Sequence, residues 1–185
     1  MGYSHVYETK RNVPVQQWVQ ITDAFKKVVL NLPEFSQTAG SYYPDVPIKL
    51  QYECDEDKAV VIDNDIIRFN GDGENGHETF LLCRAKFSNE TFYDFCKTNR
   101  KPYDFAVCAA LILTDHYAPG CYRIVSDGTA EEWMPALLHL RKILEMPNLQ
   151  LPVCFNDGLS EGDRSTPTLE QYVATGVFRP DAEWF

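Results

Sequence analysis

The sequence predicts an α+β fold in which helices pack on a mixed β-sheet, followed by a C-terminal arm. Apolar residues recur at helical spacing across residues 14–31, which is typical of an amphipathic helix with one side facing a core. Between residues 48 and 84 the pattern changes to short β-rich segments separated by turn residues. The longest unbroken apolar run, residues 105–113, follows Pro102, which is well placed in the first turn of another helix. The expected order of elements is β-α-β-β-β-α-β-α.

Residues 2–8 are expected to form the first strand. Alternate side chains of a strand point to the same face, so Tyr3, His5 and Tyr7 share one face. Tyr3 is interpreted as a core residue. His5 and Tyr7 are either core residues as well or the wall of a polar pocket, because both carry ionisable groups.

The first helix is expected to begin after Asn12 and Pro14 and to end before Pro33. A loop rich in Pro, Ser, Gly and Tyr follows it. Short strands are then expected, two of them joined by a hairpin turn, at residues 49–52, 60–62, 66–69 and 78–83.

Residues 71–76 match the pattern G-x-G-x-x-G, but we reject them as a dinucleotide-binding motif. That motif requires a helix to begin at the glycines and to offer its N-terminal NH groups to a pyrophosphate. Here β-rich sequence follows, and Asp72 and Glu74 would repel phosphate. The segment is interpreted as a glycine turn. Asp72, Glu74, His77 and Glu78 could instead hold a divalent cation. Their spacing fits neither an EF-hand nor an HExxH pattern, so no metal site is predicted.

In the second half, residues 88–97 are expected to form a short helix with Phe92 and Phe95 facing inward. Further helices are expected over residues 102–117 and from the capping-box pair Thr129 and Glu132 to about residue 145, with a strand at 121–125 between them. Residues 1–146 are expected to be a single globular domain, and residues 147–185 an extension or docking arm.

Composition limits the classes of function. The 185 residues suffice for one domain with a full core, and no run approaches the roughly 18 apolar residues of a membrane span. The N-terminus lacks the pattern of a signal peptide. A net charge of −10 argues against nonspecific binding to nucleic acid. The six cysteines form no CxxC pair and are interpreted as reduced core thiols of a cytosolic protein.

Against this acidic background, three cations lie within five positions: Lys97, Arg100 and Lys101. Tyr103 and Asp104 follow at the start of the apolar run. Arginine suits bidentate recognition of phosphate or carboxylate, and the start of a helix adds positive potential, so the segment is a candidate anion site. The alternatives are a solvated surface loop and pairing with acidic neighbours.

A second set of residues could transfer protons. His5, Tyr7, His77, Glu78 and Asp127 combine imidazoles with a phenol and carboxylates, and a histidine beside a carboxylate serves as a general base or a metal ligand. Asp127 follows a strand, where open sheets place their ligand crevice. Single histidines are also commonly structural, and no nucleophile elbow or Walker loop is present.

Five segments carry a resemblance to a known family: Gly2-Tyr-Ser-His-Val-Tyr7, Phe69-Asn-Gly71, His77-Glu-Thr-Phe80, Phe95-Cys-Lys-Thr-Asn-Arg-Lys-Pro-Tyr-Asp104 and Ser126-Asp-Gly128. They resemble a family of small uncharacterised proteins of tailed phages and prophages, whose members look like G-Y-T-H-Y-W at the start and F-C-K-T-A-R-K-P-Y-D in the middle. This chain departs from the pattern at Ser4, Val6, Tyr7 and Asn99. The resemblance implies a phage origin, and hence the cytoplasm of an infected bacterium, rather than an activity. It says nothing of residues 147–185.

The matched segments are rich in polar and ionisable residues, which a pocket needs and a scaffold does not. The candidates for catalysis are His5, His77, Glu78 and Asp127. The candidates for ligand binding are Tyr7, Asn70, Lys97, Thr98, Arg100, Lys101, Tyr103 and Asp104.

The leading hypothesis is a phage accessory protein that binds, and in one version hydrolyses, an anionic nucleotide-like small molecule in counter-defence. In that version the cations hold phosphate and an imidazole transfers the proton. A second hypothesis is a non-enzymatic inhibitor whose acidic surface imitates nucleic acid towards a host protein. The residues of that surface are Asp55, Glu56, Asp57, Asp63, Asp65, Asp72 and Glu74. A third is a virion or assembly component that docks through residues 147–185. The sequence identifies no cofactor and no oligomeric state.

Overall fold

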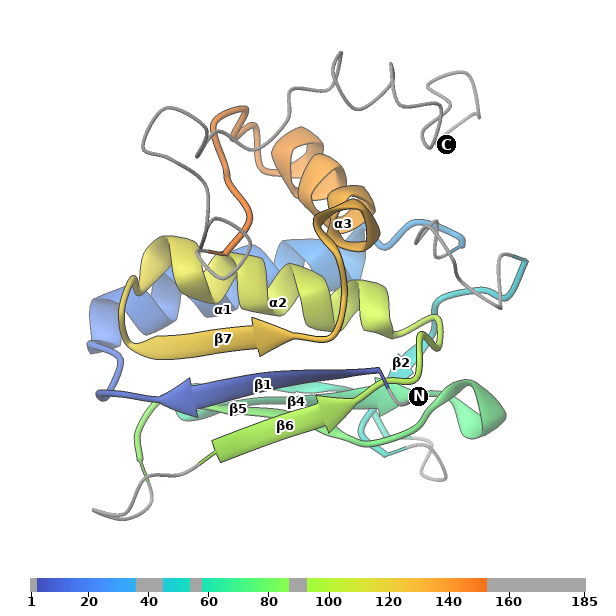
Figure 1. Cartoon of the computed structure of the whole chain (residues 1–185), viewed down its shortest axis with the longest axis horizontal. Coiled ribbons are helices and arrows are strands. Elements are labelled where there is room, and N and C mark those ends of the chain that lie inside the picture. The colour runs from blue at the N-terminus through green and yellow to red at the C-terminus, as the bar shows by residue number, and fades with distance from the viewer. Residues whose placement is uncertain (1–2, 36–44, 54–57, 87–92, 153–185) are drawn as a thin grey trace.

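A computed structural model describes residues 3–35, 45–53, 58–86 and 93–152 of the chain. It confirms the α+β class, with helices packed on one side of antiparallel sheets (Figure 1). In chain order the elements are β1 Ser4–Thr9, α1 Val15–Leu30, β2 Leu50–Gln51, β3 Val61–Ile62, β4 Ile66–Gly71, the 3-10 turn η1 Gly73–Asn75, β5 Phe80–Cys83, β6 Tyr93–Lys97, α2 Asp104–Tyr117, β7 Tyr122–Ser126 and α3 Ala130–Ile143. Within the described ranges, no helix combines the length and the apolar character needed to cross a bilayer.

The strands form two antiparallel sheets. One has the order β6-β1-β7, and in the other β4 pairs with β5 along one edge and with β2 and β3 along the opposite edge. The sheets meet where the backbone NH of Glu78 donates to the carbonyl of Lys97, at 3.3 Å. Aromatic contacts continue the core across this junction, since the rings of Tyr7 and Phe80 lie 5.2 Å apart.

Helix α2 is the centre of the core. Its side chains from Asp104 to Thr114 are buried on all sides, as expected of a helix that is apolar around its whole circumference. It lies against α1 and α3 on the inner side of the sheets (Figure 1). Phe25 of α1 in turn stacks on Phe69 of β4, with ring centroids 5.3 Å apart.

Most local predictions are confirmed. The helices expected over 14–31 and 102–117 are α1 and α2, and the Thr129–Glu132 capping box opens α3. The glycine turn contains the single 3-10 turn η1 and leads into β5, so no α-helix begins there. The described cysteines, Cys83, Cys96, Cys108 and Cys121, are free and buried.

The helix expected over 88–97 is wrong for its described part. Residues 93–97 form β6, which pairs with β1, and strand alternation then turns Cys96 inward and leaves Phe95 58% exposed. A short apolar segment fits either periodicity, and here the long-range pairing with β1 decides. Residues 87–92 lie outside the described ranges, as do those from 153 to 185, which include most of the expected arm.

Asp94 provides a test of the packing between the sheets. It lies on β6 opposite Tyr7, and burial raises the pKa of its carboxyl from 3.8 to about 6. A raised pKa means that the folded state binds the proton more tightly, so the stability contributed by this group falls as the pH rises from about 4 to about 6. Asp94→Asn should therefore raise the free energy of unfolding at pH 7.5 by about 1 kcal/mol, after allowance for solvent screening.

Urea denaturation at pH 7.5 and pH 4.5 measures the effect, and the gain should shrink at the lower pH. The matched control is Asp23→Asn, on the exposed side of α1, which should change the free energy of unfolding by less than about 0.5 kcal/mol at either pH. Equal gains for Asp94→Asn at both pH values would contradict the assignment.

Candidate functional site

The polar segments singled out in the sequence meet at one end of the sheets. Because neighbouring strands are antiparallel, the start of β1 lies beside the ends of β6 and β7, and the end of β4 lies beside the start of β5. Helices α2 and α3 follow the ends of β6 and β7, and the η1 turn lies beside the segment that leads into α2. We call this end of the sheets the Lys97 end, after the last residue of β6.

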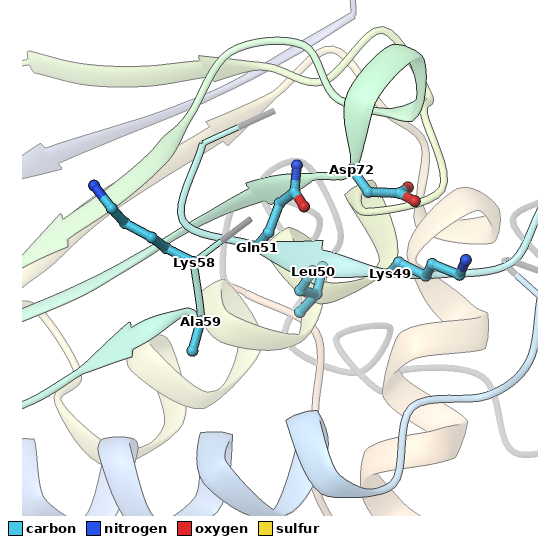
Figure 2. A pocket seen from close by; sticks show the side chains of 6 residues that line it. All are labelled: Lys49, Leu50, Gln51, Lys58, Ala59 and Asp72. Carbon is cyan, nitrogen blue, oxygen red and sulfur yellow. The ribbon is translucent and has the colours of Figure 1, made fainter. Parts of the chain in front are cut away.

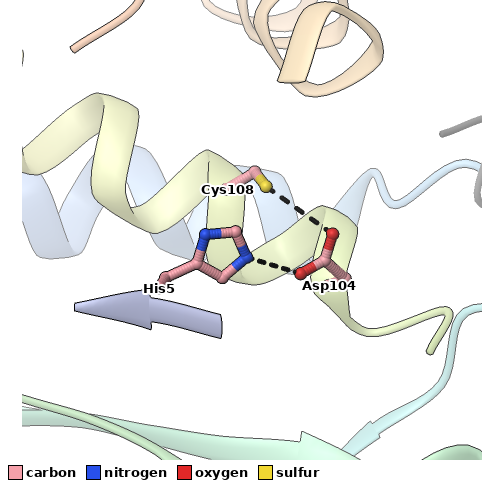
Figure 3. Close-up of side chains that lie close together, drawn as sticks. All are labelled: His5, Asp104 and Cys108. Atoms are coloured by element: carbon pink, nitrogen blue, oxygen red, sulfur yellow. Dashed lines mark hydrogen bonds and ion pairs between the residues drawn. The ribbon is translucent and has the colours of Figure 1, made fainter. Parts of the chain in front are cut away.

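His5 is the centre of a buried polar network at the Lys97 end. Its Nε2 lies 2.7 Å from Oδ1 of Asp104, and its Nδ1 lies 3.0 Å from Oγ of Ser126. Thr98 donates its hydroxyl to the same Asp104 oxygen at 2.5 Å. The Cys108 thiol lies 3.8 Å from the other oxygen, and Figure 3 shows His5, Asp104 and Cys108 together. His5 is 0% and Asp104 1% exposed, whereas Ser126 is half-buried.

The other contacts of Ser126 fix the direction of these hydrogen bonds. Its Oγ accepts from the backbone NH of Gly128 at 2.8 Å and from Nε1 of Trp133 at 3.3 Å. A hydroxyl has two acceptor lone pairs and one proton, so the proton of Ser126 remains for Nδ1 of His5. The proton of the neutral imidazole is then on Nε2 and is donated to Asp104.

This tautomer bears on metal binding. One ligand atom each from His5, Asp104 and Cys108 lies within 4.8 Å of the others, which is close enough to surround an ion. A metal ligand must be an unprotonated nitrogen, however, and Nε2 of His5 carries the proton in this arrangement. In this arrangement the three residues are joined by hydrogen bonds, and a metal ion would bind only after the Nε2 proton moved to Nδ1 or was released.

Tyr3 links the network to the cationic segment. Its buried ring lies edge-on to His5, with centroids 5.1 Å apart, and the Arg100 guanidinium lies 4.0 Å above its centroid. Burial raises the pKa of the Tyr3 phenol well above its ordinary value. In the described part of the chain its hydroxyl has no hydrogen-bond partner. A Cβ on Gly128 would lie 2.5 Å from this hydroxyl oxygen and 3.1 Å from Oγ of Ser126.

The cationic segment turns sharply after β6. Asn99 and Arg100 have φ of 52° and 55°, in the left-handed region that side chains other than glycine rarely adopt. The turn brings Nε of Arg100 to 2.6 Å from Oε1 of Glu132 and Nζ of Lys101 to 2.7 Å from the carbonyl of Glu74.

Asn70 and Glu78 stabilise the adjoining turn. The Asn70 amide bonds the backbone NH and the carbonyl of His77, at 3.1 and 3.0 Å. Glu78 accepts from the backbone NH of Lys97 at 2.7 Å, and its carbonyl accepts from the Tyr103 hydroxyl at 2.7 Å. These contacts join the start of β5 to the end of β6 and the start of α2.

The structure thus brings some candidates together and separates others. His5, Thr98 and Asp104 are in direct contact. Tyr7 points into the core against Phe80, and burial raises the pKa of its phenol, so it lies away from the network. His77 and Asp127 have exposed side chains, and Asp127 accepts from the backbone NH of Ser4 at 3.0 Å.

Sequence reasoning missed Ser126, Cys108 and Trp133 as members of the network. Ser126 stands in one of the matched segments, but its contact with His5 depends on the register of β1 and β7, which pairs His5 with Ser126. The signal for Trp133 was its place on the apolar face of α3, which indicated only a core position.

A separate open groove of about 650 Å³ lies beside β2 (Figure 2). It forms where β2 and β3 pair with the same edge of β4 and residues 52–60 are inserted between them. It is lined by Lys49, Leu50, Gln51, Lys58, Ala59 and Asp72, so none of the candidate residues contributes to it.

Comparison with known proteins finds no family model, no curated protein and no solved structure that matches the chain. The interpretation of the site therefore depends on its geometry and on the chemistry of its side chains.

The contact between Gly128 and Tyr3 gives a prediction. In Gly128→Ala the new methyl group would meet the phenol at 2.5 Å, so the ring must move, which should lower the free energy of unfolding by about 1–3 kcal/mol. Tyr3→Phe removes a hydroxyl that lacks a partner among the described residues, so it should leave stability unchanged or raise it.

The double variant tests the contact itself. In the Tyr3→Phe background, Gly128→Ala should lower the free energy of unfolding by at least about 0.5 kcal/mol less than it does in the parent chain. Urea denaturation of the four proteins completes the cycle, and strictly additive effects would contradict the close approach.

Proposed function

We propose that this protein binds an anionic, nucleotide-like small molecule at the Lys97 end. The observation that carries the proposal is the pair of left-handed residues Asn99 and Arg100, inside the segment with three cations. An arginine in this region costs of order 1–3 kcal/mol, whereas asparagine tolerates it better, and such residues concentrate at ligand sites and active sites. The turn keeps the guanidinium of Arg100 on the ring of Tyr3.

Carboxylates of Glu132 and Asp127 also lie at this end, so an anion can bind only where a cation is not already neutralised. No described carboxylate pairs with the ammonium of Lys97, which lies half-buried on β6. Arg100 is held in place by Glu132, and Lys101 by a backbone carbonyl, which reduces the side-chain entropy that a ligand must overcome. A guanidinium held in this way is suited to phosphate oxygens.

The phage resemblance supplies the setting for the proposal. In an infected bacterium the ligand would be a host signalling nucleotide, which the protein would sequester or cleave. The alternative of an acidic inhibitor requires a continuous row of carboxylates. Asp63 and Asp65 precede β4, whereas Asp72 and Glu74 follow it, about 20 Å away for a strand of six residues. The remaining acidic candidates, residues 55–57, lie outside the described ranges.

Isothermal titration of the full chain with nucleotides and with inorganic phosphate tests the proposal. At least one phosphate-bearing ligand should bind, and binding should weaken as the salt concentration rises. Lys97→Ala should weaken it about 10- to 100-fold, because a hydrogen bond to a charged group contributes roughly 1.5–3 kcal/mol.

The matched control is Lys49→Ala with Lys58→Ala, which removes two cations from the groove beside β2 and should leave the affinity unchanged. Loss of binding in this control, with Lys97→Ala unaffected, would move the site to the groove and contradict the proposal. Absence of binding to every ligand, together with recovery of a basic host protein by pull-down, would favour the acidic inhibitor.

A further inference from the structure

We infer that Ser126 is a nucleophile, activated by His5 and Asp104, that attacks the phosphorus of a phosphoester, with the Tyr3 hydroxyl donating to the oxygen that gains charge. This inference deepens the proposed function by adding a covalent step at the same end of the molecule. It is carried by two observations: the direction of the hydrogen bonds along the three residues, and an unpartnered buried donor beside Ser126.

We call the hydrogen-bonded series Ser126, His5 and Asp104 the relay. Its hydrogen bonds run in the direction expected of an activated serine. The Ser126 hydroxyl donates to Nδ1 of His5 at 3.0 Å, and Nε2 of the same ring donates to Asp104 at 2.7 Å. A base that accepts the hydroxyl proton, and that is itself oriented by a carboxylate, is the general arrangement for activating a nucleophile. The NH groups of Gly128 and Trp133 enforce this direction, since they occupy the lone pairs of Oγ.

Burial varies along the relay in the way that catalysis requires. Asp104 is 1% and His5 0% exposed, so the charge that develops on the imidazole would be stabilised by a carboxylate shielded from water. Ser126 is half-buried and ends β7, next to the exposed Asp127. It is therefore the member of the relay that lies nearest to solvent.

The Tyr3 hydroxyl is the second observation. It is a fully buried donor, without a partner in the described part of the chain, and such groups are rare because they cost about 1–3 kcal/mol. The Tyr3 hydroxyl and Oγ of Ser126 lie close to one point, the position that a Cβ on Gly128 would occupy. The Tyr3 hydroxyl is 2.5 Å from this point and Oγ of Ser126 is 3.1 Å from it. That point is too close to the Tyr3 hydroxyl for another atom, so the Tyr3 ring and Gly128 must move apart before a phosphoryl oxygen can accept from this donor.

The step balances as follows. Oγ of Ser126 releases its longer accepted hydrogen bond, from Nε1 of Trp133 at 3.3 Å, and uses that lone pair to form a bond to phosphorus. Its proton passes to Nδ1 of His5, and the bond to the leaving alkoxide breaks. The leaving oxygen takes the proton from His5. A water molecule then gives a proton to Nδ1 of His5 and attacks the phosphorus of the phosphoserine. The bond between phosphorus and Oγ breaks, phosphate or a phosphomonoester is released, and the proton returns from His5 to Oγ.

Diisopropyl fluorophosphate tests the nucleophile directly, because it reacts at phosphorus and is neutral, so that it does not need the cations. Incubation with the full chain, followed by peptide mass spectrometry, should give an adduct on Ser126 and none on the Ser126→Ala protein. Asp104→Asn should slow labelling at least 100-fold, because it favours the wrong tautomer of His5. Tyr3→Phe should slow it at least tenfold while the melting temperature is kept.

Ser4→Ala, at the edge of the same site, is the control and should label like the parent chain. A folded protein with no adduct on Ser126 overturns the inference. An unchanged rate of Ser126 labelling in Tyr3→Phe also overturns it. Tyr3→Phe remains informative if Asp104→Asn does not fold. Labelling of Ser126 without binding of any nucleotide would contradict the proposed ligand but support the nucleophile. Nucleotide binding without labelling of Ser126 would support the proposed ligand but contradict the nucleophile.

Discussion

The hydrogen bond between His5 and Asp104 is the contact on which the Lys97 end depends. A carboxylate that is 1% exposed is strongly destabilising unless donors surround it. Here an imidazole, a hydroxyl and a thiol point at its two oxygens. Since these donors come from β1, from the segment after β6 and from α2 itself, the need to satisfy one buried charge fixes three parts of the chain relative to one another.

Antiparallel topology explains why residues about one hundred positions apart can share this network. β1 is the central strand of its sheet, and both of its neighbours run in the opposite direction. The beginning of β1 therefore lies between the two strand ends that lead into α2 and α3. A residue on the inner face at the beginning of β1 faces the first turns of both helices. His5 occupies this position.

Two features at this end lower stability, and each has counterparts elsewhere in the described chain, such as Glu145 with φ of 55° and the unpartnered Nε2 of His139. One is the left-handed backbone at Asn99 and Arg100, and the other is the unpartnered hydroxyl of Tyr3. They are neighbours, because Arg100 lies on the ring of Tyr3. Natural sequences keep such local costs mainly where function requires them, which is why the proposed anion site and the proposed nucleophile are placed at the same end.

The sequence by itself determined the elements with a strong local signal: α1 through its periodicity, α2 through its apolar run, and the start of α3 through a capping box. It also indicated His5, Asp104 and the cations as candidates. Only the tertiary structure decided that residues 93–97 are a strand and that Ser126 contacts His5. The physical reason is that helical periodicity and capping involve residues a few positions apart, whereas strand pairing and a buried polar network depend on register between distant segments.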